Sequence, residues 1–144
     1  MPDHAKEIRL FQRAADQRLT TAEFLLEHGY HLDAVYLAGY AVECALKALI
    51  LTRTASRDFA AMWMNLTQAG AKGHDYDYLK ELLKRQNQKR NKSDREAFGV
   101  IVDRLKVVAS WSTSLRYQVG NLKRKEALSF FDAAKDIRDW CARS

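Results

Sequence analysis

Residues 33–52, DAVYLAGYAVECALKALILT, decide the fold of this protein. After Asp33, which we expect to cap a helix, the only charged side chains in the stretch are Glu43 and Lys47. Small residues that allow a partner helix to approach closely recur along it: Ala34, Ala38, Gly39, Ala41, Ala45 and Ala48. A length of about 20 residues would also suit a membrane span. Two charges in the middle and no second span nearby favour the core helix of a bundle, without membrane association.

The segments on either side of this stretch also carry apolar residues at helical spacing. Together with the central stretch, they predict helices over residues 4–28, 33–52, 57–69 and about 124–142. Another helix is expected after Gly73, and Ser93 followed by Glu96 forms a capping box that predicts a further helix start. One proline and six glycines leave few helix breakers. We therefore expect an all-α fold, an up-and-down antiparallel bundle of four or five long helices, forming one domain over residues 1–144.

The net charge of +6 is concentrated in two short segments. Residues 84–95 (KRQNQKRNKSDR) contain six basic residues and one acidic residue, and residues 116–125 (RYQVGNLKRK) contain four basic residues and no acidic one. The rest of the chain is therefore slightly acidic. The first segment lacks apolar residues over 84–92 and is expected to be a solvated helix end and loop, which can contact nucleic acid. The second favours a phosphate-bearing partner near Arg116.

The remaining composition excludes several classes of site. Cys44 and Cys141 lie 97 positions apart and form neither a disulfide framework nor a metal-binding pair. His28 and His31 cannot share one regular helical face, and no glycine-rich phosphate loop occurs. We expect no metal site and no cofactor. The charged N-terminus lacks an apolar signal stretch, so we expect a reducing, cytoplasmic location.

The central helix carries the first candidate constellation. Tyr36, Tyr40, Glu43 and Lys47 are spaced four, three and four residues apart, so they share one face. One interpretation is a polar edge of a buried helix, where Glu43 and Lys47 form an intrahelical ion pair. The other is a polar groove in which Glu43 positions a ligand and the tyrosines stack.

Two other motifs carry residues that suit chemistry. The guanidinium of Arg116 suits bidentate phosphate binding, and Tyr117 offers a stacking face and a hydroxyl. The alternative is an arginine that extends from a helix end beside a core tyrosine. In Gly73-His74-Asp75, we expect His74 or Asp75 to cap the following helix, and with Asp75 as the cap His74 would be solvated or buried.

Taken together, these segments, which cover most of residues 5–142, resemble the HEPN family of small all-α domains. The resemblance rests on Ala15-x-x-Arg18-Leu19, Ala22-Glu23-x-Leu25-Leu26, Gly29-Tyr30, Ala34-x-x-Leu37-Ala38-Gly39-Tyr40-x-x-Glu43-x-x-Leu46-Lys47, Gly73-His74-Asp75 and Leu115-Arg116-Tyr117. It implies an up-and-down bundle, commonly a homodimer with an interface groove that handles RNA or nucleotides. Some members lie beside a nucleotidyltransferase partner.

The resemblance also implies where an active site would lie. Active HEPN ribonucleases carry an arginine followed four to six residues later by a histidine, with a polar residue from another helix. Arg116 matches the arginine and Glu43 the polar residue, but Asn121 stands where the histidine is expected. Asparagine can hydrogen-bond but cannot transfer a proton near neutral pH. Lys123 stands where some members have a nucleotide-accepting tyrosine.

Three hypotheses follow. In the first, this is a HEPN-like module that binds nucleotide, RNA or a partner protein and is catalytically impaired. Its candidate catalytic residues are Arg116, Glu43 and Asn121, and its candidate binding residues are Tyr40, Lys47, Tyr117, Lys123 and Arg124. In the second, it is a metal-independent endoribonuclease of the toxin type, with Tyr117, Lys123 or His74 in the acid–base role. In the third, it is a purely structural interaction domain.

Overall fold

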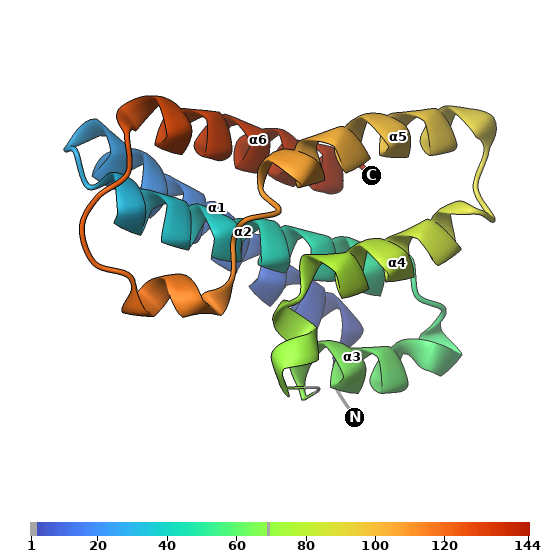
Figure 1. The fold of residues 1–144 in the computed structure, drawn as a ribbon. Helices are drawn as coiled ribbons and strands as arrows, with labels where there is room; N and C mark the ends of the chain where they lie inside the picture. The colour runs from blue at the N-terminus through green and yellow to red at the C-terminus, as the bar shows by residue number, and fades with distance from the viewer. Residues whose placement is uncertain (1–2, 69) are drawn as a thin grey trace.

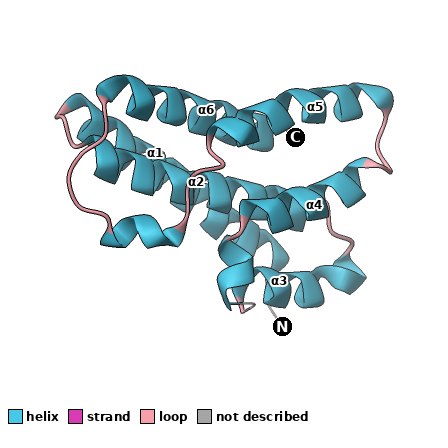
Figure 2. Ribbon diagram, viewed as in Figure 1, coloured by secondary structure: helices cyan, strands magenta, loops and turns pink. Residues whose placement is uncertain are grey.

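The central helix α2 (His31–Thr52) organises the molecule. A computed structural model describes residues 3–68 and 70–144, and Figure 1 shows the other helices arranged around α2. They are α1 (His4–Glu27), α3 (Phe59–Thr67), α4 (Tyr76–Asn87), α5 (Lys92–Val107) and α6 (Arg124–Arg143), with short 3₁₀ helices η1 (Ser56–Asp58), η2 (Gly70–His74) and η3 (Thr113–Tyr117). Successive α-helices reverse direction along the chain, and the described residues contain no strand (Figures 1 and 2). The predicted all-α bundle is confirmed.

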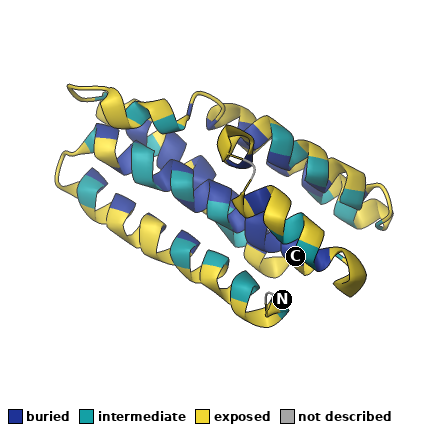
Figure 3. Ribbon diagram, turned by 90° about the horizontal axis from the view of Figure 1, so that it is seen from below, coloured by how far each residue is buried: buried dark blue, intermediate teal, exposed yellow. Residues whose placement is uncertain are grey.

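Helix α2 is surrounded because its residues are apolar or small on nearly every face. Helix α1 and helix α6 pack along it on one side, and α4 and η3 contact it on another. It is long and apolar enough to cross a membrane, yet 78% of its most apolar 18-residue window is buried inside the protein. Figure 3 shows buried positions gathered on the inner faces of the helices and exposed positions on the outer faces. This is the pattern of a bundle core.

The beginning of α2 differs from the prediction. The helix begins at His31, so Asp33 lies in its first turn and is not its cap, and the residue at the N-cap position, Tyr30, forms no side-chain capping bond. Instead Asn121, which precedes α6, accepts a hydrogen bond from the Leu32 backbone N–H at 3.0 Å. The first turn is therefore capped from a distant part of the chain, and periodicity within 33–52 could not reveal this.

Two of the other predicted helix starts have different outcomes. Asp75 caps α4, as predicted, and accepts from the Asp77 N–H at 2.9 Å. The start predicted at Ser93 is wrong, because Asn91 caps α5 and accepts from the Asp94 N–H at 2.8 Å. The side chains of Asn91 and Ser93 can both cap a helix, and the structure uses Asn91, which comes first after the turn that follows α4.

The helix predicted over 57–69 corresponds to η1 and α3, and position 69 lies outside the described residues. The stretch 84–92 is not solvated throughout, because α4 continues to Asn87, which is only 4% exposed.

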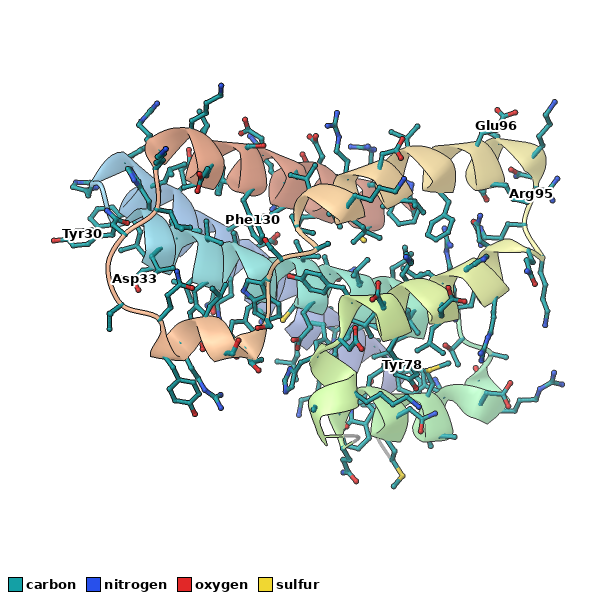
Figure 4. All side chains as sticks on the ribbon, in the orientation of Figure 1. Tyr30, Asp33, Tyr78, Arg95, Glu96 and Phe130 are labelled. Carbon is teal, nitrogen blue, oxygen red and sulfur yellow. The ribbon has the colours of Figure 1, made fainter. Side chains whose placement is uncertain are left out.

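The two basic segments lie at opposite ends of the molecule. Figure 4 places Arg95 beside the α4–α5 turn and Tyr30 at the other end, and the loop from η3 to α6 runs past that other end (Figure 1). The segments therefore do not form one continuous patch.

Candidate functional site

A buried carboxylate on α2 is the centre of the candidate site. Glu43 and Lys47 are each only 4% exposed, and Lys47 Nζ donates to Glu43 Oε2 at 3.0 Å. On the other carboxylate oxygen, Oε1, lies His74 Nδ1 at 2.8 Å. A carboxylate only accepts hydrogen bonds, so Nδ1 carries the proton and His74 Nε2 remains for another partner. The side chain of His74 is 44% exposed. The hydrogen-bonded unit of Lys47, Glu43 and His74 therefore extends from the core to the surface.

The position of His74 depends on η2, which crosses above Lys47. Gly73 is buried there, and a Cβ at this position would lie 2.9 Å from the Leu66 carbonyl oxygen and 3.8 Å from Lys47 Nζ. The missing side chain lets η2 lie directly on α2 and α3. Because Asp75 then caps α4, His74 is held between two fixed segments.

Aromatic rings cover the neighbouring part of α2. Trp111 lies against Gly39, and its Nε1 donates to the Tyr36 carbonyl at 3.0 Å. The ring of Tyr76 stacks on Trp111 with centroids 5.2 Å apart, and its hydroxyl donates to the Gly39 carbonyl at 2.6 Å. Burial raises the pKa of Tyr76 well above its usual value. These contacts fix α4 and the segment that leads into η3 relative to α2.

Tyr40 lies on the same face of α2, between the aromatic cluster and His74. Its ring meets Trp111 edge-on at 4.9 Å and His74 edge-on at 6.4 Å. Burial, together with the hydrogen bond from Tyr36, raises the pKa of Tyr40 to about 12, and the Arg116 charge opposes this rise. The Tyr40 hydroxyl is therefore protonated at neutral pH and is available as a donor.

Arg116 lies at the surface in η3, and its charge reaches the side of α2 that carries Tyr36 and Tyr40. It is exposed, its guanidinium carbon lies 4.8 Å from the ring centroid of Tyr117, and its charge acts on the Tyr36 and Tyr40 hydroxyls. Tyr117 is 74% exposed. None of the ion pairs formed by the described residues involves Arg116. Arg116 and Tyr117 therefore present a charge and a ring to solvent rather than packing into the core.

Asn121 lies elsewhere and is engaged by the backbone. Its Nδ2 donates to the Gly29 carbonyl at 2.8 Å, and its Oδ1 accepts from the Leu32 and Leu122 N–H groups, each at 3.0 Å. Leu32 precedes Glu43 by 11 residues, or about 16 Å along a helix that rises 1.5 Å per residue. Asn121 therefore holds the α1–α2 turn, and none of its three hydrogen bonds involves Glu43 or His74.

The other predicted binding residues are also divided by the structure. Lys47 is buried under η2 and serves Glu43, whereas Lys123 and Arg124 are exposed at the start of α6. The structure therefore brings Glu43, Lys47 and His74 together beside Tyr40, which the Arg116 charge reaches from η3, and places Lys123 and Arg124 at the start of α6. His74 was a minor candidate in the sequence, although the Gly73-His74-Asp75 motif was visible. Its contact with Glu43 spans 31 positions.

The remaining reactive groups are inert or dispersed. Burial raises the pKa of Cys44 to about 11 and that of Cys141 to about 12, so both thiols stay protonated at neutral pH. Across the described part of the chain, no group of three or more His, Cys, Asp and Glu side chains is placed to hold a metal ion. The hydrogen-bonded unit of Glu43, Lys47 and His74 is thus the buried ionic feature of this face.

Comparison with known proteins agrees with this architecture. The family model for the HEPN domain matches residues 8–144. No curated protein and no solved structure shows a significant match. The match covers nearly the whole chain, including the buried carboxylate, η2 and η3. The chain therefore belongs to the HEPN family.

Proposed function

We propose that this HEPN domain binds single-stranded RNA or a nucleotide through its phosphate, on the α2 face bordered by η2 and η3. Membership of the family indicates a nucleotide- or RNA-related function. The observation that supports this proposal is Arg116, an exposed guanidinium without an ion-pair partner among the described residues, whose charge acts on the protonated Tyr40.

The chemistry of these groups matches a phosphodiester. A guanidinium can donate two parallel hydrogen bonds to phosphate oxygens, and a neutral phenol or imidazole can add a third. Tyr117 offers an exposed ring on which a base can stack. The negative charge of Glu43 is offset by the Lys47 ammonium in a buried ion pair, which reduces its repulsion of a phosphate. In this arrangement Glu43 and Lys47 are positioning residues for His74.

Arg116→Ala is expected to weaken binding of a fluorescein-labelled 12-nucleotide single-stranded RNA about tenfold at low salt, because one charge-assisted phosphate contact is lost. The slope of log affinity against log salt should fall by about one. Fluorescence anisotropy at several salt concentrations measures both. Arg57→Ala removes the same charge from exposed η1 and should change neither value strongly. Equal affinities for the Arg116→Ala variant and the wild type would refute the proposal.

The Glu43–His74 pair supports a second candidate, a metal-independent ribonuclease. A carboxylate that fixes the Nδ1 proton leaves Nε2 as a base in a surface-accessible position. In that reaction His74 would take the proton from a ribose 2′-hydroxyl, and the 2′-oxygen would attack phosphorus. The bond to the 5′-oxygen then breaks, giving a cyclic phosphate. The leaving oxygen takes a proton from water, and the resulting hydroxide takes the proton held by His74, which returns to its neutral form. Arg116 would neutralise the added charge on the phosphate.

His74→Asn separates this candidate from binding alone. Its amide can still donate to Glu43 but cannot transfer a proton, so cleavage of total RNA in a chelator should fall about 10²–10⁴-fold. Asn121→His, which places histidine at the family position, should leave the rate unchanged because position 121 faces the α1–α2 turn. Gel analysis with detection of cyclic-phosphate ends measures both. Intact RNA with the wild-type protein would eliminate this candidate and leave the binding proposal standing.

A further inference from the structure

We infer that the cavity between α4 and α5 receives one unpaired nucleobase of the strand bound on the α2 face, so that the domain selects single-stranded over duplex RNA. This inference rests on the proposed function and specifies its ligand. The cavity has a volume of about 400 Å³, within the range of small-ligand pockets. His74 lines it, so the cavity adjoins the site already described.

The walls of the cavity suit a base and its ribose. Buried rings of Tyr76 and Trp111 and the buried side chain of Leu105 provide apolar surface. Sites for small organic ligands are mostly apolar, with a few polar groups that fix orientation. Here the polar groups are Asp75, Asp77, Ser112 and Thr113, which can hydrogen-bond to base edges or ribose hydroxyls.

The rim of the cavity carries one lysine from α4, Lys80, and one from α5, Lys106. Lys80 lies 3.7 Å from Asp77 and Lys106 lies 3.4 Å from Asp103, in pairs at the protein surface. Exposed pairs of this kind contribute little energy, so either lysine can exchange its partner for a phosphate. A strand whose base enters the cavity would place its backbone along this rim.

The cavity and the phosphate-binding arginine are linked through one short element. Thr113 lines the cavity and Arg116 follows three residues later in η3, about 6 Å along a 3₁₀ helix. The backbone can therefore pass from the cavity to Arg116 within a short length of strand. A paired base is held inside a duplex and cannot enter, so the geometry selects unpaired nucleotides.

The experiment compares a 12-nucleotide single-stranded RNA with a 12-unit abasic sugar-phosphate strand of equal charge and with the duplex. The wild type should bind the RNA at least about tenfold more tightly than either of the other two, as expected for loss of the base contacts in the cavity and at Tyr117. Ala109 is exposed and lines the cavity, so Ala109→Trp fills it without entering the core. This variant should lose most of the wild-type preference for RNA over the abasic strand, keeping only the part that a base stacked on Tyr117 contributes.

Two further variants complete the design. Ala71→Trp, from the opposite wall, should act like Ala109→Trp, whereas Ala61→Trp on an exposed face of α3 should bind RNA like the wild type. Unchanged RNA affinity in both cavity variants, or equal wild-type affinity for RNA and abasic strands, overturns the base-cavity inference alone. Failure of the wild type to bind either strand at low salt overturns the proposed function with it.

Discussion

Replacing Gly39 with alanine is expected to destabilise the protein by about 1–3 kcal/mol, although alanine is the better helix former. A Cβ at this position would overlap the indole ring of Trp111, which is buried and hydrogen-bonded to the Tyr36 carbonyl. The gain in helix propensity is about 1 kcal/mol. Overpacking costs about 1–3 kcal/mol or more, and loss of the indole hydrogen bond adds about 1 kcal/mol. The clash therefore outweighs the propensity gain.

Gly99→Ala provides the matched control. Gly99 lies within α5, is exposed, and a Cβ there would have no neighbour within 4 Å. This change should stabilise the protein by about 0.5–1 kcal/mol. Thermal unfolding followed by circular dichroism should show Tm falling by several degrees for Gly39→Ala and rising slightly for Gly99→Ala. If the Gly39→Ala variant has a Tm equal to or above that of the wild type, as the control does, Trp111 does not pack against position 39.

Glu43→Leu is expected to have the largest effect of any single change at the site. It leaves the Lys47 ammonium buried without its carboxylate partner, and the nearest remaining favourable contact is the Phe11 ring, whose centroid is 5.9 Å from Nζ. Removing one partner of a buried ion pair costs about 3–5 kcal/mol. Urea unfolding should therefore show a much lower midpoint. His74 also loses the group that orients it.

The double variant Glu43→Leu with Lys47→Leu separates stability from function. Apolar replacement of both partners removes the unpaired charge, so most of the lost stability should return. RNA binding or cleavage should not return, because nothing then fixes the His74 ring. Equal stability of the single and double variants would show that the pair is solvated. A functional double variant would show that His74 acts without Glu43.

The local features of this fold could be predicted from the sequence with good accuracy. The spacing of apolar residues predicts α1, α2 and α6 to within two residues at each end, and Asp75 was one of the two residues predicted to cap α4. These features depend on residues three or four positions apart, whose contacts follow from helical geometry. The polar stripe of Tyr36, Tyr40, Glu43 and Lys47 was predicted for the same reason. Its burial was not predicted, because burial depends on what packs over the helix.

The sequence by itself therefore determined the helices, the buried central segment and the presence of a Glu–Lys pair one turn apart. Only the tertiary structure decided that His74 completes this pair from 31 positions away, and that Asn121 caps α2 across 89 positions instead of serving the site. The spacing of residues along one helix is set by its backbone hydrogen bonds. The pairing of residues from different segments is set by how those helices pack and by which loops cross them.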